Sequence, residues 1–189
     1  MTRIIAGAAG SITLNVPDHG TRPTSDRVRE AMFSALEARN AIDYARVVDL
    51  YAGSGALGLE ALSRGADTVV LVEKNPTAAK IASTNATRVA EASEVEVSVV
   101  DVVTKPVARY LEQAPEGSAD LIFIDPPYDM TQSELEADLA SMLRICAPSA
   151  LIVIERSSRS EDVVLPAPFK ELGSKKYGET VLWWARGPR

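Results

Sequence analysis

The sequence contains a single cysteine, a single histidine and no long hydrophobic run. Cys146 alone cannot form a disulfide within the chain. With His19 as the only other soft ligand, a zinc or iron site would be hard to build, so we expect no metal. No apolar stretch approaches the length of a membrane span, and residues 1–11 lack the basic and long apolar regions of a secretory signal. These absences predict a soluble, cytoplasmic protein without a membrane partner.

Basic residues are outnumbered as well, since 20 Lys and Arg stand against 26 Asp and Glu, a net charge of −6. An acidic chain is at first sight a poor partner for nucleic acid, because neutralisation of phosphates by Lys and Arg supplies much of the affinity. The acid is concentrated in residues 47–155, which hold 7 basic and 17 acidic groups, whereas residues 156–189 hold 7 and 4. If both ends of the chain fold onto one face, they could form a local basic surface; ordinary solvated charge would explain the same residues equally well. The basic residues in question are Arg3, Arg22, Arg27, Arg29, Lys175, Lys176, Arg186 and Arg189.

Strand-like and helical patterns alternate from residue 47 onward. The strand-like segments are residues 47–51, 68–73, 95–100, 119–125 and 150–155, and the helical patterns between them are residues 56–64, 76–90, 104–113 and 133–143. This alternation predicts an α/β fold with a largely parallel sheet. Residues 121–124 and 151–154 are apolar at every position, as strands covered by helices on both faces should be, so we expect them at the centre of the sheet.

The two ends of the chain depart from this alternation. Residues 170–177 and 179–185, separated by Gly178, are typical of a closing β-hairpin, which predicts an antiparallel edge. Near the start, residues 3–5 and 11–15 look like short strands, and residues 25–38 like an amphipathic helix capped by Thr24 or Ser25. We therefore expect one structural domain, with an extension of residues 1–46 packed on a core of residues 47–189.

A glycine-rich segment, Asp49–Gly58, follows the first core strand and opens a helix. Its glycines would let a ligand approach the backbone at the carboxyl end of that strand. Gly53, Gly55 and Gly58 also fit the dinucleotide-binding spacing, so the glycines alone do not separate NAD from S-adenosylmethionine. Asp49 favours S-adenosylmethionine, because a carboxylate beside the loop would repel a pyrophosphate and attract the ammonium and sulfonium groups of the methyl donor.

Acidic residues near the next two strands extend this site. Glu73 ends the second strand, where a carboxylate can bind the ribose hydroxyls. Asp101, placed beyond the third strand, could accept a hydrogen bond from the adenine amino group, with the main-chain NH of Val102 as a further partner. An acid that merely ends a strand or caps a helix would explain Glu73 and Asp101 without any ligand, and this alternative stays open for both.

The segment Asp125-Pro126-Pro127-Tyr128 carries the chemistry that we expect. It directly follows residues 119–124, which places it at the carboxyl end of a central strand, where open sheets bind ligands. Two prolines remove two NH donors and leave acceptors. An aromatic amine presents two N–H donors, of which the Asp125 carboxylate can accept one and the Pro126 carbonyl the other. Its nitrogen lone pair is then less conjugated with the ring and more nucleophilic.

Tyr128 adds a face on which a flipped or unpaired base can stack. On its own, the Asp-Pro-Pro-Tyr segment could be only a rigid turn at a strand end. Its combination with a glycine-rich loop after the first strand and acids at the next two makes the turn-only interpretation much weaker. The residues therefore predict a methyltransferase that acts on an exocyclic amine of a nucleobase, with Asp125, Pro126, Pro127 and Tyr128 as its catalytic segment.

Longer stretches of the chain resemble a known family. Asp49–Gly55 and Asp125–Tyr128 resemble the donor-binding and amino-methyltransferase motifs of class I methyltransferases, and residues 22–33 together with Asp49–Gly55 closely resemble the bacterial 16S ribosomal RNA guanine-N2 methyltransferases of RsmD type. The resemblance covers essentially the whole chain. It implies a Rossmann-like, seven-stranded sheet and methylation of one guanine, guanine 966, of 16S RNA within an assembled or partly assembled 30S subunit.

The resemblance also implies residues that hold the donor. The stretch of residues 22–26 would help to enclose its methionine end, which adds two residues to the site. The expected donor-binding residues are thus Arg22, Thr24, Asp49, Tyr51, Gly53, Ser54, Gly55, Glu73, Asp101 and Val102. A surface helix start would explain Arg22 equally simply. Nothing in the sequence demands more than a monomer.

Other functions fit parts of the pattern. A DNA adenine or cytosine methyltransferase would need base-reading elements for which this chain has little room. A protein-glutamine methyltransferase typically carries Asn where this chain has Asp125. An NAD-dependent oxidoreductase is opposed by Asp49 and by the Asp-Pro-Pro-Tyr segment. A noncatalytic RNA-binding assembly factor that keeps the methyltransferase fold is opposed by the intact Asp125 and glycine loop.

Overall fold

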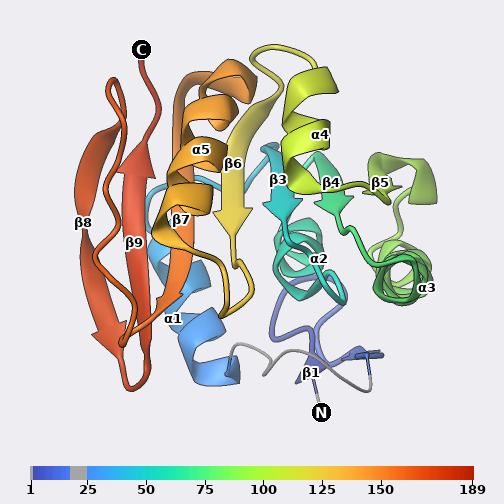
Figure 1. Cartoon of the computed structure of the whole chain (residues 1–189). Helices are drawn as coiled ribbons and strands as arrows, with labels where there is room; N and C mark the ends of the chain where they lie inside the picture. Colours follow the sequence, from blue (N-terminus) through green and yellow to red (C-terminus); the bar gives the residue numbers. More distant parts are fainter. Residues whose placement is uncertain (1, 18–24) are drawn as a thin grey trace.

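A seven-stranded sheet forms the centre of the computed structural model, which describes residues 2–17 and 25–189 (Figure 1). Its strands are β3 (Arg46–Leu50), β4 (Thr68–Val72), β5 (Val100–Val103), β6 (Ala119–Ile124), β7 (Cys146–Ser157), β8 (Lys170–Tyr177) and β9 (Thr180–Arg186). The order across the sheet is β5-β4-β3-β6-β7-β9-β8. β9 is antiparallel to β7 and β8, and the other neighbours are parallel, which confirms a mostly parallel sheet with a C-terminal antiparallel hairpin.

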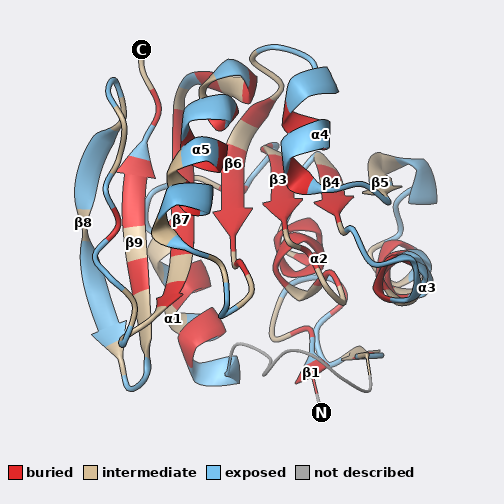
Figure 2. Cartoon of the chain, in the orientation of Figure 1, coloured by how far each residue is buried: buried red, intermediate tan, exposed pale blue. Residues whose placement is uncertain are grey.

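The last strand does not form the edge of the sheet. β9 lies between β7 and β8, so the edge strand is β8, whose direction matches that of the parallel strands. The sequence predicts the hairpin, whereas the insertion of its second arm depends on apolar burial. Leu182, Trp184 and Ala185 of β9 are buried, while most of β8 is exposed (Figure 2).

Helices cover both faces of the sheet. The side chains of α1 (Asp26–Glu37), α2 (Ala56–Ser63) and α3 (Pro76–Ala92) share one buried cluster with one face of the sheet. The helices α4 (Val107–Gln113) and α5 (Gln132–Met142) pack on the other face. Residues 121–124 of β6 and 151–154 of β7 are at most 5% exposed, because both faces of these strands are covered. Their expected central position is confirmed.

The N-terminal segment packs on the same face as α1. Its strands β1 (Thr2–Arg3) and β2 (Thr13–Leu14) form a two-residue antiparallel ladder, shorter than expected. The Ser25 side chain accepts a hydrogen bond from the Val28 N–H at 3.3 Å and so caps α1 as expected. Ile4, Val28 and the other buried apolar residues of α1 belong to the same cluster as the core strands. The division of the chain at residue 46 stays a prediction.

One predicted strand was wrong. Residues 95–100 alternate in polarity as a half-buried strand would, but Val97–Val99 form the 3-10 helix η1, and the strand begins only at Val100. Val100 pairs with Val69, the second residue of β4, so residues 95–98 extend past the start of β4 and have no neighbouring strand. Val95 and Val97 are accordingly 40% and 48% exposed. Across residues 2–17 and 25–189, no helix is both long and apolar enough to cross a bilayer.

Candidate active site

Three loops meet at the carboxyl edge of the parallel strands, which is the lower edge of the sheet in Figure 1. They are the glycine-rich loop after β3, Glu73 after β4, and the Asp-Pro-Pro-Tyr segment after β6. β3 is the direct neighbour of β6, and Leu50 pairs with Ile124, so the glycine loop and Asp125 start at the same level. The chain leaves β3 toward β4 on one side and has β6 on the other. This is a topological switch point, where open α/β sheets bind ligands.

The glycine loop has the shape that an approaching ligand needs. Gly53 has φ +55°, and a Cβ added there would meet nothing within 4 Å, so the backbone is open at this point. Gly58 serves a different purpose, since a Cβ there would lie 2.5 Å from the Leu71 side chain of β4. Its absence lets α2 approach the sheet closely. The open backbone at Gly53 fits a nucleoside donor such as S-adenosylmethionine.

Asp49 is buried beneath this loop. Its side chain is 1% exposed, and Oδ2 accepts a hydrogen bond from the Gly58 N–H at 2.9 Å. Burial raises the pKa of Asp49 to about 7, an effect that the Gly58 hydrogen bond opposes and the nearby Glu73 carboxylate reinforces. Asp49 therefore ties the loop to the first turn of α2 and holds a carboxyl group that titrates near neutrality.

This pKa predicts a pH-dependent affinity for S-adenosylmethionine. A bound cation favours ionised Asp49, so binding releases a proton and the affinity rises as the pH passes through about 7. We expect binding about tenfold tighter at about pH 8 than at about pH 6, as measured by calorimetry. The Asp49→Asn variant should lose this part of the dependence, which separates Asp49 from the titrating amino group of the donor. An equal dependence in both proteins would contradict the assignment.

Glu73 links the loop to the start of α3. Oε2 accepts a hydrogen bond from the Gly53 N–H at 2.9 Å, and Oε1 accepts one from the Asn75 N–H at 2.8 Å. Asn75 in turn caps α3 by accepting hydrogen bonds from Thr77 and Ala78. Glu73 is thus held beside the open Gly53, at the position expected for a ribose-binding carboxylate. Its contact with ribose stays a prediction.

Asp101 and Val102 do not lie where the sequence placed them. They are inside β5 and pair with Val70 and Leu71, because the strand begins at Val100 instead of ending there. The Asp101 side chain is exposed. Burial of Tyr110 on α4 raises the pKa of this phenol to about 12, and the nearby charge of Asp101 adds to the effect. The expected location beyond the strand was wrong, and the adenine contact stays a prediction.

Tyr51 begins the turn after β3 with φ +65°, and its hydroxyl donates a hydrogen bond to Asp138 of α5. Asp138 is 8% exposed, and burial raises its pKa; burial also raises the pKa of Tyr51. The phenol of Tyr51 thus joins the glycine loop to α5. Sequence reasoning missed Asp138. The sequence does carry a signal for it, because an acidic residue falls on the same helix face as the buried Leu135, Leu139 and Met142.

Asn85 of α3 is a second residue that sequence reasoning missed. It is fully buried, and its Nδ2 donates hydrogen bonds to the carbonyls of Asn15 and Ser54 at 2.8 and 2.9 Å. Its Oδ1 accepts one from the Asn15 N–H at 2.9 Å. One amide therefore fixes the N-terminal segment against the glycine loop. Arg22 and Thr24, expected at the donor, lie outside the described residues.

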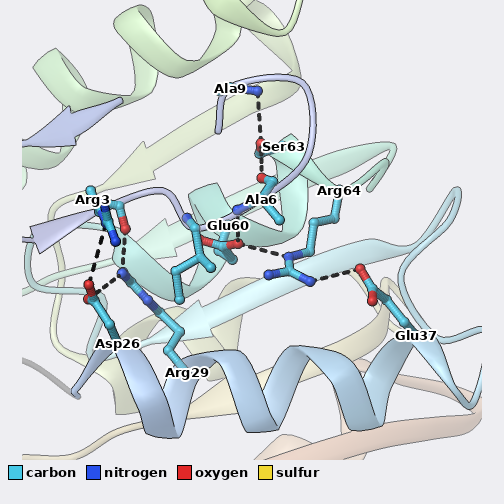
Figure 3. A network of polar contacts seen from close by, with 10 residues as sticks. Arg3, Ala6, Ala9, Asp26, Arg29, Glu37, Glu60, Ser63 and Arg64 are labelled. Atoms are coloured by element: carbon cyan, nitrogen blue, oxygen red, sulfur yellow. Dashed lines mark hydrogen bonds and ion pairs between the residues drawn. The ribbon is translucent and has the colours of Figure 1, made fainter. Parts of the chain in front are cut away.

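Buried charge anchors the N-terminal segment a second time (Figure 3). The fully buried Glu60 of α2 accepts hydrogen bonds from the N–H groups of Ile5 and Ala6, at 2.7 and 3.1 Å. It also pairs with Arg64 at 2.8 Å, and Arg64 reaches Glu37 of α1 at 2.8 Å. The chain on both sides of residues 18–24 is thus tied to the helix that the glycine loop opens.

The Asp-Pro-Pro-Tyr segment leaves β6 as a short turn. Asp125 is half-buried and Pro126 is buried, whereas Tyr128 is 68% exposed, an unusual position for a large aromatic side chain. The Met130 N–H donates to the Pro127 carbonyl at 3.0 Å, and the Met130 carbonyl accepts a hydrogen bond from the buried Arg156 of β7 at 3.2 Å. These bonds close the turn and tie it to β7. In the described part of the chain, no group of three His, Cys, Asp or Glu could hold a metal.

Comparison with known proteins identifies the family. The family model described as "Conserved hypothetical protein 95" matches residues 2–186. The ribosomal RNA small subunit methyltransferase D of Haemophilus influenzae is 32% identical over 93% of this chain and 89% of its own length. The Escherichia coli K12 protein of the same name is 35% identical over 87% of this chain and 79% of its own length. The chain belongs to the RsmD family.

Solved structures agree with this assignment. The Escherichia coli protein yhhF has a TM-score of 0.83 at 29% identity and covers 100% of this chain and 98% of its own. An RNA methyltransferase of Salinibacter ruber, solved with S-adenosyl-L-homocysteine, has a TM-score of 0.66 at 17% identity and covers 89% of this chain and 95% of its own. The latter likeness shows only the fold. The chain therefore has the class I methyltransferase fold of the RsmD family.

Proposed function

We propose that this protein transfers a methyl group from S-adenosylmethionine to the exocyclic N2 amine of a guanine in 16S ribosomal RNA. Membership of the RsmD family supports the coarser part, an S-adenosylmethionine-dependent ribosomal RNA methyltransferase. The observation that carries the chemistry is the placement of Asp125-Pro126-Pro127-Tyr128 beside the open glycine loop at the switch point of the sheet. Such a protein works in the cytoplasm, where ribosomal subunits are made.

The donor supplies an electrophilic methyl group on a positively charged sulfur. On the protein side, Gly53 leaves room for the donor, Glu73 stands ready for its ribose, and Asp49 contributes a buried carboxyl group beneath the loop. The lower pKa that a cation imposes on Asp49 makes its charge available when the donor is bound. These groups set the position of the donor at the edge of β3.

The Asp125 segment positions the amine. The Asp125 carboxylate and the Pro126 carbonyl each accept a hydrogen bond from one N–H of the amine. These two bonds draw the nitrogen lone pair out of conjugation with the ring and aim it at the donor. Tyr128, exposed beside them, stacks on the base. Alignment of this kind can contribute roughly 7–11 kcal/mol to a barrier, so no separate base is needed before attack. After transfer, the proton passes to Asp125 or to water.

The base and its setting come from the family resemblance: guanine 966, methylated in an assembled or partly assembled 30S subunit. We propose a monomeric enzyme, because nothing in the sequence demands more than one copy. A ribonucleoprotein substrate is consistent with the acidic charge of the chain, because shape and protein contacts can replace part of the phosphate attraction. The same argument disfavours naked RNA as the preferred substrate.

The decisive experiment is methyl transfer from labelled S-adenosylmethionine to undermodified 30S subunits and, in parallel, to naked 16S RNA. The methylated nucleoside is identified by mass spectrometry. We expect N2-methylguanosine, formed on the 30S subunit. Methyladenosine or methylcytidine would keep the mechanism and overturn the substrate. Donor binding without transfer to either RNA would contradict the proposed function.

A further inference from the structure

A groove of about 510 Å³ lies away from the loops of the active site, between α1 and the β8–β9 hairpin. One wall contains Ala31 and Ala35 of α1 and Arg39 from the turn after it, and the hairpin wall contains Lys175, Tyr177 and Trp184. The small alanines on α1 keep the groove open. No described element covers it, and no part of the proposed reaction uses it.

The groove is basic and aromatic in an acidic protein. Its charged wall residues are Arg39 and Lys175, both cationic, although the chain has a net charge of −6. The Arg39 guanidinium lies 5.0 Å from the centre of the Trp184 ring, and the Lys175 amine 5.3 Å from that of Tyr177. Both cations are exposed. Cations that pair with phosphates, interleaved with aromatic faces and a guanidinium plane on which bases stack, suit single-stranded RNA.

A bulge shapes the hairpin wall. Glu171 pairs with Ala185 and Gly173 with Trp184, so Leu172 is an extra residue in β8. Gly173 has φ +114°, a value that strains other residues, and Leu172 is left 37% exposed at the groove. The bulge bends the edge strand locally and adds an apolar contact surface beside the two cations.

The groove also points toward the active site. β8 runs parallel to β6, so Tyr177 at its end lies at the same edge of the sheet as Asp125. Figure 1 shows the turn between β8 and β9 at the lower edge of the sheet, with α1 behind β7 and β9 and its first turn at that edge. A strand of RNA whose base enters at Asp125 can continue past this turn and into the groove.

We propose that the groove between α1 and the β8–β9 hairpin binds the unpaired RNA strand that flanks the target base. Arg39 and Lys175 contact its phosphates, and Tyr177 and the Arg39 plane stack on its bases. This inference rests on the proposed function, because the strand is that of the RNA substrate. It adds a substrate-binding surface outside the cofactor and catalytic loops.

Lysines on β8 have a second explanation, since charged side chains on an edge strand prevent pairing with other chains. The chain offers a matched control. Lys176 is adjacent to Lys175 and equally basic and exposed, but it points to the opposite face of β8, where it lines a different hollow with Trp183. An effect of overall charge would be the same at both lysines, whereas groove binding requires Lys175.

The test uses Lys175→Glu, Arg39→Gln and the double variant that carries both substitutions. Lys176→Glu is the control. We expect the double variant to raise the KM for undermodified 30S subunits roughly tenfold with kcat nearly unchanged, and to lower the slope of log affinity against log salt by about two, one per cation. Affinity for S-adenosylmethionine and the melting temperature verify that each variant is folded. Ultraviolet cross-linking should join 16S RNA to the peptide of residues 172–177.

Three results would each overturn RNA binding by the groove and leave the proposed function intact. They are an unchanged KM in the double variant, an equal rise of KM in Lys176→Glu, and cross-links from this peptide to ribosomal proteins in place of RNA. If the wild-type protein methylates no ribosomal RNA, the proposed function fails. The groove is then judged by binding of a fluorescent oligouridylate of about 10 nucleotides. Weaker binding by Lys175→Glu, with unchanged binding by Lys176→Glu, would support the groove as an RNA-binding surface. Absence of binding by the wild-type protein would exclude it.

Discussion

Replacement of Asp125 by alanine is expected to lower the rate of methyl transfer by about 10²–10³-fold, while the affinity for S-adenosylmethionine stays within about twofold. The carboxylate accepts a hydrogen bond that forms fully only as the amine attacks, so its loss falls on kcat. Asp125 follows β6 and lies outside the glycine-rich loop between β3 and α2 that would hold the donor. Single-turnover methyl transfer to 30S subunits, with calorimetric donor binding, measures both quantities.

Two variants sharpen this experiment. Asp125→Asn should recover part of the rate, because the amide oxygen still accepts one hydrogen bond although it carries no charge. Asp129→Ala removes an exposed carboxylate from the same turn and should leave the rate within about twofold. Persistent turnover by Asp125→Ala would refute the role of Asp125. Equal losses in Asp125→Ala and Asp129→Ala would indicate collapse of the turn.

Replacement of Glu60 by alanine is expected to cost about 3–5 kcal/mol in the free energy of unfolding. The change leaves Arg64, whose side chain is 6% exposed, without its buried partner, and it removes the acceptor of the Ile5 and Ala6 N–H groups. Both consequences act in a low-dielectric interior, where unpaired charges and donors are costly. Urea unfolding followed by circular dichroism measures the change.

Glu37→Ala is the matched control, because it removes the other carboxylate that pairs with Arg64. Glu37 is 52% exposed, so its pair with Arg64 is screened by water and its loss should cost at most about 1 kcal/mol. A similar cost for both variants would mean that the buried position of Glu60 does not anchor the N-terminal segment. A small cost for both would mean that the network is dispensable for stability.

Much of the fold could be predicted because local patterns and burial agree. The continuous apolar runs at residues 121–124 and 151–154 are central strands, and Ser25 caps α1 as a residue of its type should. The exception is instructive. Residues 95–100 carry a strand pattern, yet the strand starts where β4 offers a partner, at Val100. A strand needs a neighbour, and the alternation of its own residues does not supply one.

The active site divides in the same way. Sequence spacing placed the glycine loop, Glu73 and the Asp125 segment at strand ends, and parallel pairing brings them together at one edge. The partners of these loops were not predicted. Asp138, on a helix 87 residues further along the chain, accepts a hydrogen bond from the Tyr51 hydroxyl. Asn85 donates hydrogen bonds to Ser54, 31 residues away, and to Asn15, 70 residues away. Such contacts leave no periodic signal beyond a polar residue on an apolar helix face.

The sequence by itself determined the class of fold, and it predicted a loop for the donor and a segment for the amine, because these depend on short-range rules: periodicity, caps, glycine spacing and the acceptors that proline leaves. Only the tertiary structure decided that β9 lies inside the sheet and β8 at its edge, that Asp49 is buried and titrates near pH 7, and that α1 and the hairpin enclose a basic groove. These features arise from burial and from pairing between distant segments, and both are properties of the folded chain as a whole.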